Sequence, residues 1–177
     1  MIIKVGDNLE LRQVQYTDSD DIFNTIDTER EYLQKWLPFV EYTQKLEDTQ
    51  DYLKSVIEAP EQQFEYIFTI RKDNKFAGLI GFKCTDRLNK KTEIGYWLSE
   101  KSQGQGLVTK SVEKLCNFAF EELDINRIQI KCAVGNKSSI NIPRKLGFYF
   151  EGIERDGELL TGNIFADLEI YSKLRDR

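Results

Sequence analysis

The 177-residue chain contains no histidine, three cysteines, three prolines and one methionine. The absence of histidine excludes a Ser-His-Asp or Cys-His pair and the usual histidine-ligated metal sites. Any proton transfer must therefore use carboxylates, hydroxyls, lysine, tyrosine or water. The cysteines, Cys84, Cys116 and Cys132, form no C-x-x-C pair. An odd number without such a pair argues against a disulfide framework or a thiolate zinc site and indicates a reducing cytoplasm.

Long apolar runs and an excess of basic residues are also missing. No apolar run approaches the roughly 20 residues that cross a bilayer, and the first residues show no cationic stretch followed by an apolar one, so we expect neither a signal peptide nor a membrane partner. The net charge of −5 argues against a general nucleic-acid surface. Such an acidic chain suits a cationic substrate, or it simply gains solubility from the charge.

The remaining composition is that of an ordinary globular protein. Apolar residues make up 40% and charged residues 31% of the chain. The length suits one domain, residues 1–177, and we find no repeat, low-complexity tract or linker.

Hydrophobic periodicity predicts alternating groups of strands and helices. Strands are expected at residues 9–14, 64–71, 75–84, 92–98, 127–133, 149–155 and 164–174. Four helices are expected: one capped by Thr17 and Asp20, one from Asp48 to about Ala59, one at residues 108–123 and one at residues 137–146. A loop that opens with Asp156 and Gly157 is expected between the last two strands. This order predicts an α+β domain with a mixed, mostly antiparallel sheet of about seven strands.

The most informative segment is a strand that runs through a glycine-bearing turn into the longest helix, at residues 93–108. Free N–H groups at a helix N-terminus, together with the helix dipole, form an anion site. Gly104 and Gly106 lack the Cβ atoms that would keep a phosphate away from those amides. The segment therefore predicts either a phosphate site or an ordinary turn that uses glycine for its dihedral angles.

Two nucleotide motifs come close to this segment without matching it. The dinucleotide pattern G-x-G-x-x-G fails because Thr109 stands where the third glycine belongs. The P-loop pattern fails at the same residue, and the loop follows a meander of strands instead of the first strand of a βαβ unit. A nucleoside-triphosphatase would also require magnesium-dependent nucleotide binding.

The segment resembles the acetyl-CoA pyrophosphate loop of the GCN5-related N-acetyltransferases (GNAT), through Gln103-x-x-Gly106 after the strand Glu93-Ile94-Gly95-Tyr96-Trp97-Leu98. A second match is Asn136-x-x-Ser139-x-x-Ile142-Pro143-x-Lys145-Leu146-Gly147-Phe148. Trp36-Leu37-Pro38 and Asp167-x-x-x-Tyr171-Ser172 are similar to the RimJ/RimL branch, the ribosomal-protein serine/alanine N-acetyltransferases. The resemblance spans nearly the whole chain. One departure is Val108, which stands where the family usually has glycine or alanine, so its side chain must point away from the cofactor.

The resemblance implies a GNAT fold with a sheet splayed between the fourth and fifth predicted strands. It also implies acetyl-CoA as the cofactor, without a metal. The pantetheine arm would lie between residues 92–98 and 127–133, and the Leu98 amide would face the thioester oxygen. The residues implied in cofactor binding are Leu98, Gln103, Gly104, Gln105, Gly106, Leu107, Val108, Thr109, Asn136, Ser139 and Lys145.

Two residues are the candidates for catalysis. Glu93, on the same strand face as Gly95, is the candidate base, acting directly or through water, unless it forms only a surface ion pair. Ser139 is the candidate donor to the departing sulfur, unless it only caps its helix, and Tyr171 is an alternative donor.

Trp36 and Tyr96 are the candidate walls of the acceptor site, or else core aromatics. The resemblance implies transfer of an acetyl group to a primary amine, most directly the N-terminal α-amine of a ribosomal protein. A small amine or antibiotic acceptor, and a non-catalytic acyl-CoA sensor, stay open. The aromatic N-terminal helices form either the acceptor groove or the interface of a homo-oligomer.

Overall fold

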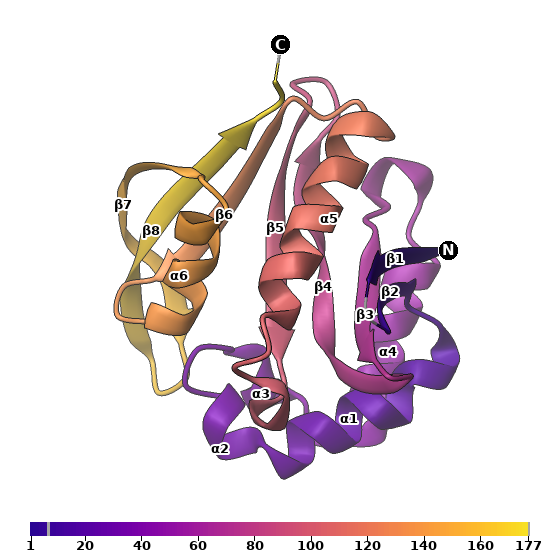
Figure 1. The fold of residues 1–177 in the computed structure, drawn as a ribbon. Coiled ribbons are helices and arrows are strands. Elements are labelled where there is room, and N and C mark those ends of the chain that lie inside the picture. The colour runs from indigo at the N-terminus through magenta and orange to yellow at the C-terminus, as the bar shows by residue number, and fades with distance from the viewer. Residues whose placement is uncertain (7, 177) are drawn as a thin grey trace.

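The computed structural model describes residues 1–6 and 8–176, and these residues form eight strands in one sheet and six α-helices (Figure 1). The strands are β1 (Ile2–Gly6), β2 (Leu9–Gln13), β3 (Ile67–Lys72), β4 (Lys75–Asp86), β5 (Lys91–Leu98), β6 (Arg127–Ala133), β7 (Tyr149–Leu160) and β8 (Ile164–Leu174). The helices are α1 (Ser19–Thr28), α2 (Arg30–Leu33), α3 (Phe39–Tyr42), α4 (Leu46–Ile57), α5 (Leu107–Glu121) and α6 (Lys137–Lys145).

The sheet has the order β1-β2-β3-β4-β5-β6-β8-β7. Every neighbouring pair among these strands is antiparallel except β5 and β6, which are parallel and connected through α5. Short hairpins join β1 to β2, β3 to β4, β4 to β5 and β7 to β8, whereas a parallel pair needs a crossover such as the one through α5. The prediction of a mixed, mostly antiparallel sheet is confirmed.

The parallel pair opens into a gap. Within the described chain, β5 and β6 pair only at Lys91–Arg127, Thr92–Ile128 and Glu93–Gln129. Beyond these residues β6 continues to pair with β8 as far as Ala133, while β5 stays with β4 as far as Leu98. The two strands therefore diverge (Figure 1), and the predicted splay is confirmed.

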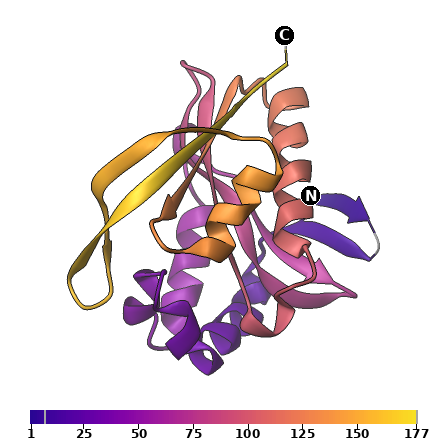
Figure 2. The same ribbon diagram turned by 60° about the vertical axis from the view of Figure 1, so that its left-hand side comes forward.

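Different helices cover the two faces of the sheet, α5 and α6 on one and α1 to α4 on the other (Figure 2). One apolar core joins α5 and α6 to side chains such as Phe68, Ile94 and Ile128. A second core joins α1 to α4 with Leu79 and Trp97 of the opposite face. Ile94 and Trp97 point to opposite faces because side chains alternate along a strand. The sheet and α5 together position the end of β5 and the loop that follows it.

The predicted count of about seven strands and four helices was too low. It omitted β1, which pairs with β2, and the short helices α2 and α3 on either side of Pro38. Each short helix has one turn, and such elements carry little periodic signal. The predicted cap at Thr17 and Asp20 was also wrong, because Asp18 accepts a hydrogen bond from the Gln15 amide in the turn before α1.

The loop predicted at Asp156 and Gly157 is a continuation of β7, which extends to Leu160. Asp156 has a φ of +50°, and the pairing register with β8 shifts between Glu154 and Glu158. Four steps along β7, from Glu154 to Glu158, face two steps along β8, so the irregularity absorbs two extra residues without ending the strand. It brings Glu158 into the sheet instead of leaving it in a surface loop.

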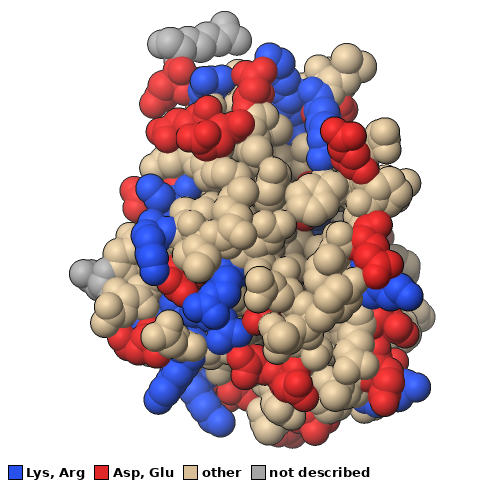
Figure 3. All heavy atoms as spheres, turned by 90° about the vertical axis from the view of Figure 1, so that its right-hand side faces the viewer, with Lys and Arg blue, Asp and Glu red and all other residues tan. Residues whose placement is uncertain are grey.

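The described surface and helices agree with two expectations from the sequence, the mixed charge and the lack of a membrane span. On the face shown in Figure 3, lysine and arginine are interspersed with aspartate and glutamate around an uncharged centre. Within residues 1–6 and 8–176, no helix has the length and apolar character of a membrane span.

Candidate functional site

The loop before α5 has the geometry of an anion site. Gly104 and Gly106 have φ angles of +75° and +70°, a region that glycine enters without strain. The first helical hydrogen bond runs from the Lys110 amide to the Gly106 carbonyl oxygen. The amides of residues 107–109 precede that bond, so they have no partner within the helix and lie at its positive end.

The side chains at the start of α5 leave these amides accessible. Gln103, Gly104, Gln105 and Gly106 are exposed, whereas the side chains of Leu107 and Val108 are buried in the core beneath α5. Val108 therefore points away from the loop, as its departure from the family pattern requires. Thr109 is half-buried.

A buried carboxylate fixes the residues that lead into the loop. Glu29, 8% exposed between α1 and α2, accepts hydrogen bonds of 2.7 Å from the Ser99 hydroxyl and from the Glu100 amide. One turn further, the Tyr32 hydroxyl accepts a hydrogen bond from the Gln103 side chain. The α1–α2 junction thus holds the chain between the end of β5 and the glycine turn. Glu29 had no signal in the sequence, because its partners lie 70 residues away.

The two sides of the gap are bridged by polar groups. The Tyr96 hydroxyl of β5 lies 3.1 Å from the carbonyl oxygen and 3.2 Å from the hydroxyl of Ser139 on α6. Ser139 Oγ donates to Cys132 Sγ at 3.2 Å, and Asn136 Oδ1 accepts from the Ser139 amide at 3.3 Å. Asn136 therefore caps α6 and orients its first turn.

Burial controls the protonation of this cluster. It raises the pKa of Tyr96 well above 10, and the nearby Cys132 raises it further. Burial also raises the pKa of the Cys132 thiol, against the lowering effect of its hydrogen bonds to Ser139 and Tyr96. Both groups keep their protons at neutral pH, so Tyr96 and Ser139 can act as hydroxyl donors and Cys132 is a neutral thiol.

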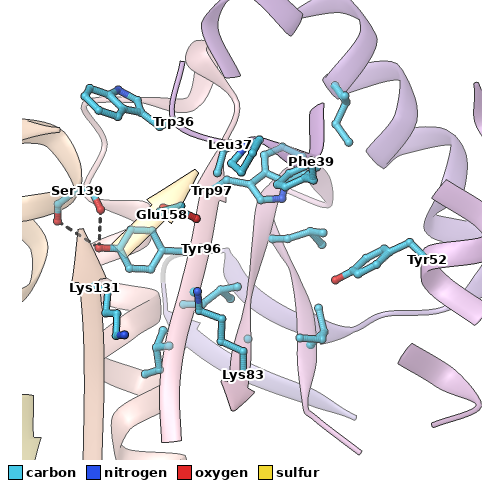
Figure 4. Close-up of a pocket in the computed structure, with 18 of the residues that line it drawn as sticks. Trp36, Leu37, Phe39, Tyr52, Lys83, Tyr96, Trp97, Lys131, Ser139 and Glu158 are labelled. Carbon is cyan, nitrogen blue, oxygen red and sulfur yellow. Dashed lines mark hydrogen bonds between the residues drawn. The ribbon is translucent and has the colours of Figure 1, made fainter. Parts of the chain in front are cut away.

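A cavity of about 530 Å³ opens beside this cluster. Trp36, Tyr96, Asn136 and Ser139, four of the predicted site residues, line it (Figure 4). Its other lining residues come from the helices α1, α3 and α4 and from strands β3 to β7. The cavity therefore joins the predicted acceptor walls to the predicted proton donor.

Glu93, the predicted base, lies beside the cavity and is not among its lining residues. Its carboxylate is 8% exposed, pairs with Lys83 Nζ at 2.8 Å and accepts a hydrogen bond from Gln129 at 3.3 Å. Burial lowers the pKa of Lys83, but the bond to Glu93 and the charges of Glu93 and Glu158 together outweigh it, and the net pKa is raised. The lysine therefore keeps its charge.

Sequence reasoning missed Glu158, a second carboxylate that does line the cavity. Figure 4 shows it near Tyr96, facing the same space as Lys83 and Lys131. Among the described residues, none forms a hydrogen bond or ion pair with the Glu158 side chain. Burial raises its pKa, Lys83 and Lys131 lower it, and Glu93 raises it, with a net increase. A carboxylate that has a raised pKa and faces a cavity is suited to accept a proton.

Tyr171, Lys145 and Leu98 also do not line this cavity. Tyr171 is 1% exposed, and its hydroxyl accepts from Arg144 Nε at 2.8 Å and donates to Glu169. Lys145 is exposed in the last turn of α6. Leu98 is half-buried at the end of β5, on the opposite face from Trp97. The described residues contain no cluster of three or more Cys, Asp or Glu side chains arranged to hold a metal ion.

Comparison with known proteins gives consistent matches. The family described as an acetyltransferase (GNAT) domain matches residues 8–149. The Bacillus subtilis (strain 168) protein YdaF is 34% identical over 176 residues, which cover 97% of this chain and 94% of that protein. A ribosomal-protein-serine acetyltransferase of Escherichia coli (strain K12) is 30% identical, with 98% and 97% covered. The solved structure of RimL, a ribosomal L7/L12 alpha-N-protein acetyltransferase in complex with coenzyme A, superposes with a TM-score of 0.94 at 30% identity and covers 99% of each chain.

Proposed function

We propose, from the premise that this chain belongs to the GNAT family of acetyltransferases, that it transfers the acetyl group of acetyl-CoA to the N-terminal α-amine of a protein. The acceptor we propose is a ribosomal protein, which also suits the reducing cytoplasm that the cysteines indicate. The observation that carries the proposal is the course of β5, which separates from β6, lines the cavity at Tyr96 beside Ser139 and ends shortly before the glycine loop. Neither a membrane nor a nucleic acid is needed for this reaction.

In this proposal the coenzyme A diphosphate binds the amides of residues 107–109 and the exposed loop of Gln103, Gly104, Gln105 and Gly106. The pantetheine arm enters the gap, where β5 and β6 offer unpaired backbone groups, and binds like an added strand. Asn136 and Lys145 contribute from α6. The Leu98 amide then donates to the thioester oxygen as that oxygen gains charge, which is worth about 2.7–4 kcal/mol for one such donor.

Transfer proceeds by direct attack of the amine on the thioester carbonyl carbon. The new C–N bond forms, the C–S bond breaks, and the thiolate leaves. We assign its proton to the Ser139 hydroxyl, which hydrogen-bonds to Tyr96 and Cys132. A protonated Tyr96 beside Ser139 favours this assignment, because it keeps a second donor at the same point.

The amine must lose a proton during attack. A peptide α-amine has a pKa near 8, so a sizeable minority is already neutral at pH 7 and the base only receives the second proton. Glu93 and Glu158 are the two carboxylates on this side. Glu93 is held by Lys83 and Gln129, whereas the Glu158 side chain lines the cavity and forms no hydrogen bond or ion pair with a described residue. We therefore propose Glu158 as the direct acceptor, with Glu93 acting through water or through Lys83.

The test is free-thiol release from acetyl-CoA with peptides that begin with serine or alanine, and with polyamines. We expect peptide-dependent release that E158Q lowers about 100- to 10,000-fold in kcat/KM. The substitution E93Q should cost less, and E113Q, at an exposed position on α5, should leave the rate unchanged.

A larger loss in E93Q than in E158Q would return the role of base to Glu93. Release with polyamines alone would indicate a small-amine acetyltransferase. Tight acetyl-CoA binding without release for any acceptor would contradict the proposed activity and indicate a sensor.

A further inference from the structure

The same cavity extends past Tyr96 and Ser139 to a second end, which we call the chamber. Strands β4 and β5 form its floor. Gly81 and Gly95 are direct register partners in this floor. A Cβ atom at Gly81 would lie 2.7 Å from the Tyr66 carbonyl oxygen, so the close approach of β3 requires glycine there. A Cβ atom at Gly95 would meet only the Lys83 side chain, at 3.5 Å. The pair leaves the floor without side chains, which opens a path from the gap toward α4.

The two ends of this cavity differ in chemistry. The end at the gap is polar, with Tyr96, Ser139, Lys83, Lys131 and Glu158. The far end, under α1, α3 and α4, is lined mainly by Ile22, Ile26, Phe39, Tyr52, Ile67, Leu79 and Trp97. Figure 4 shows Phe39, Trp97 and Tyr52 around this space. An apolar chamber of this kind excludes a charged group, because a buried charge without a partner is costly.

One buried polar atom at the far end lacks a partner. Thr49 of α4 lines the cavity and is 2% exposed, and its Oγ1 makes no hydrogen bond. Leaving a buried hydroxyl unpaired costs free energy. Phe39 and Tyr52, at the mouth, keep about two-fifths of their surface exposed. The chamber thus has uncovered apolar surface at Phe39 and Tyr52, which a bound apolar side chain would cover.

We infer that this chamber binds the side chain of the acceptor's second residue and that this side chain is apolar. The inference rests on the proposed function. The chamber lies two strand spacings, about 10 Å, from the gap at β5. The second Cα of a peptide lies about 5 Å from the amine, and a leucine or phenylalanine side chain covers the remaining distance. The first side chain starts too near the amine to reach it.

The test uses peptides that begin with serine and vary only at the second residue. We expect kcat/KM to be at least tenfold higher with leucine or phenylalanine than with glycine, because one methylene in an apolar pocket is worth about 10- to 200-fold. Aspartate and lysine should be poorer than glycine. Equal values for leucine and glycine would overturn the inference while leaving the proposed function intact, whereas no acetylation of any peptide would overturn both.

Variants at α4 add a structural readout. T49L fills the chamber and should reduce the leucine-to-glycine ratio toward 1, whereas T49V keeps the side-chain volume and should leave that ratio unchanged. Q50A, at the exposed neighbouring position, is a second control. An unchanged ratio in folded T49L would contradict the inference, and if T49L does not fold, the peptide series decides it alone.

A different occupant is the acyl chain of a longer acyl-CoA. Hexanoyl-CoA is the probe for it. We expect a kcat/KM at least tenfold below that of acetyl-CoA, because the chamber is reserved for the acceptor. Hexanoyl transfer as fast as acetyl transfer would assign the chamber to the acyl group and overturn the inference.

Discussion

Strands β3, β4 and β5 are covered by helices on both faces, whereas β6, β8 and β7 are covered mainly on the α6 side. The uncovered face of that second half carries ion pairs instead, Arg127–Glu151 at 2.5 Å and Lys131–Glu154 at 2.6 Å. Apolar burial is the dominant stabilising effect in proteins, and partly exposed ion pairs contribute little. The first half is therefore the rigid support for the glycine loop before α5, and the second supplies polar groups such as Ser139 and Glu158.

The largest expected effect compares one apolar residue from each half. Leu115 of α5 is fully buried, so L115A should reduce the free energy of unfolding by about 2–5 kcal/mol through lost burial and a cavity. Phe165 of β8 is 59% exposed, so F165A should change it by less than about 0.5 kcal/mol. Chemical denaturation followed by circular dichroism measures both. Equal losses would mean that the two halves are stabilised alike.

The next effect concerns the support of the cofactor loop. E29A leaves the Ser99 hydroxyl and the Glu100 amide without their acceptor, at about 1–3 kcal/mol for an unpaired buried group. We expect the KM for acetyl-CoA to rise about tenfold or more, with a smaller change in the KM for the peptide. Steady-state kinetics measures this split. E31A, at an exposed position on α2, is the control, and an unchanged KM for acetyl-CoA in E29A would remove Glu29 from a positioning role.

The smallest expected effect is the pH dependence of unfolding that comes from the Arg127–Glu151 ion pair in the second half of the sheet. Hydrogen bonds from Arg127 lower the pKa of Glu151 to about 2, against burial, and the Ser172 hydroxyl assists. Because the folded pKa lies below the ordinary value of 4.5, the pair stabilises the fold above about pH 4.5 and loses this effect as the pH falls toward 2. Partial exposure keeps its size below about 1 kcal/mol.

Unfolding of the wild type and of E151Q at several pH values measures that contribution. The difference between the two proteins should be largest near pH 7 and should shrink below pH 4.5. A difference that grows in acid would contradict the sign of the shift.

The sequence predicted the local geometry of the loop before α5 better than the contacts around the cavity. The turn with Gly104 and Gly106 is local, so its dihedral angles and the helix start follow from neighbouring residues, and the bounds of β6 and β8 agree with the alternation of their side chains. Glu29 and Glu158 were missed because their roles depend on contacts across the fold. The bulge that carries Glu158 into β7 replaced a predicted loop, since the pairing with β8 overrides the turn preference of Asp156 and Gly157.

The central claim is that the main-chain amides at the start of α5 bind the diphosphate of coenzyme A. Isothermal titration calorimetry of the purified wild-type protein with coenzyme A and with pantetheine, which lacks the diphosphate and the nucleotide, tests it most directly. We expect saturable heat with coenzyme A and none with pantetheine at the same concentrations. Equal binding of the two compounds, or no heat with coenzyme A at millimolar concentration, would contradict the claim.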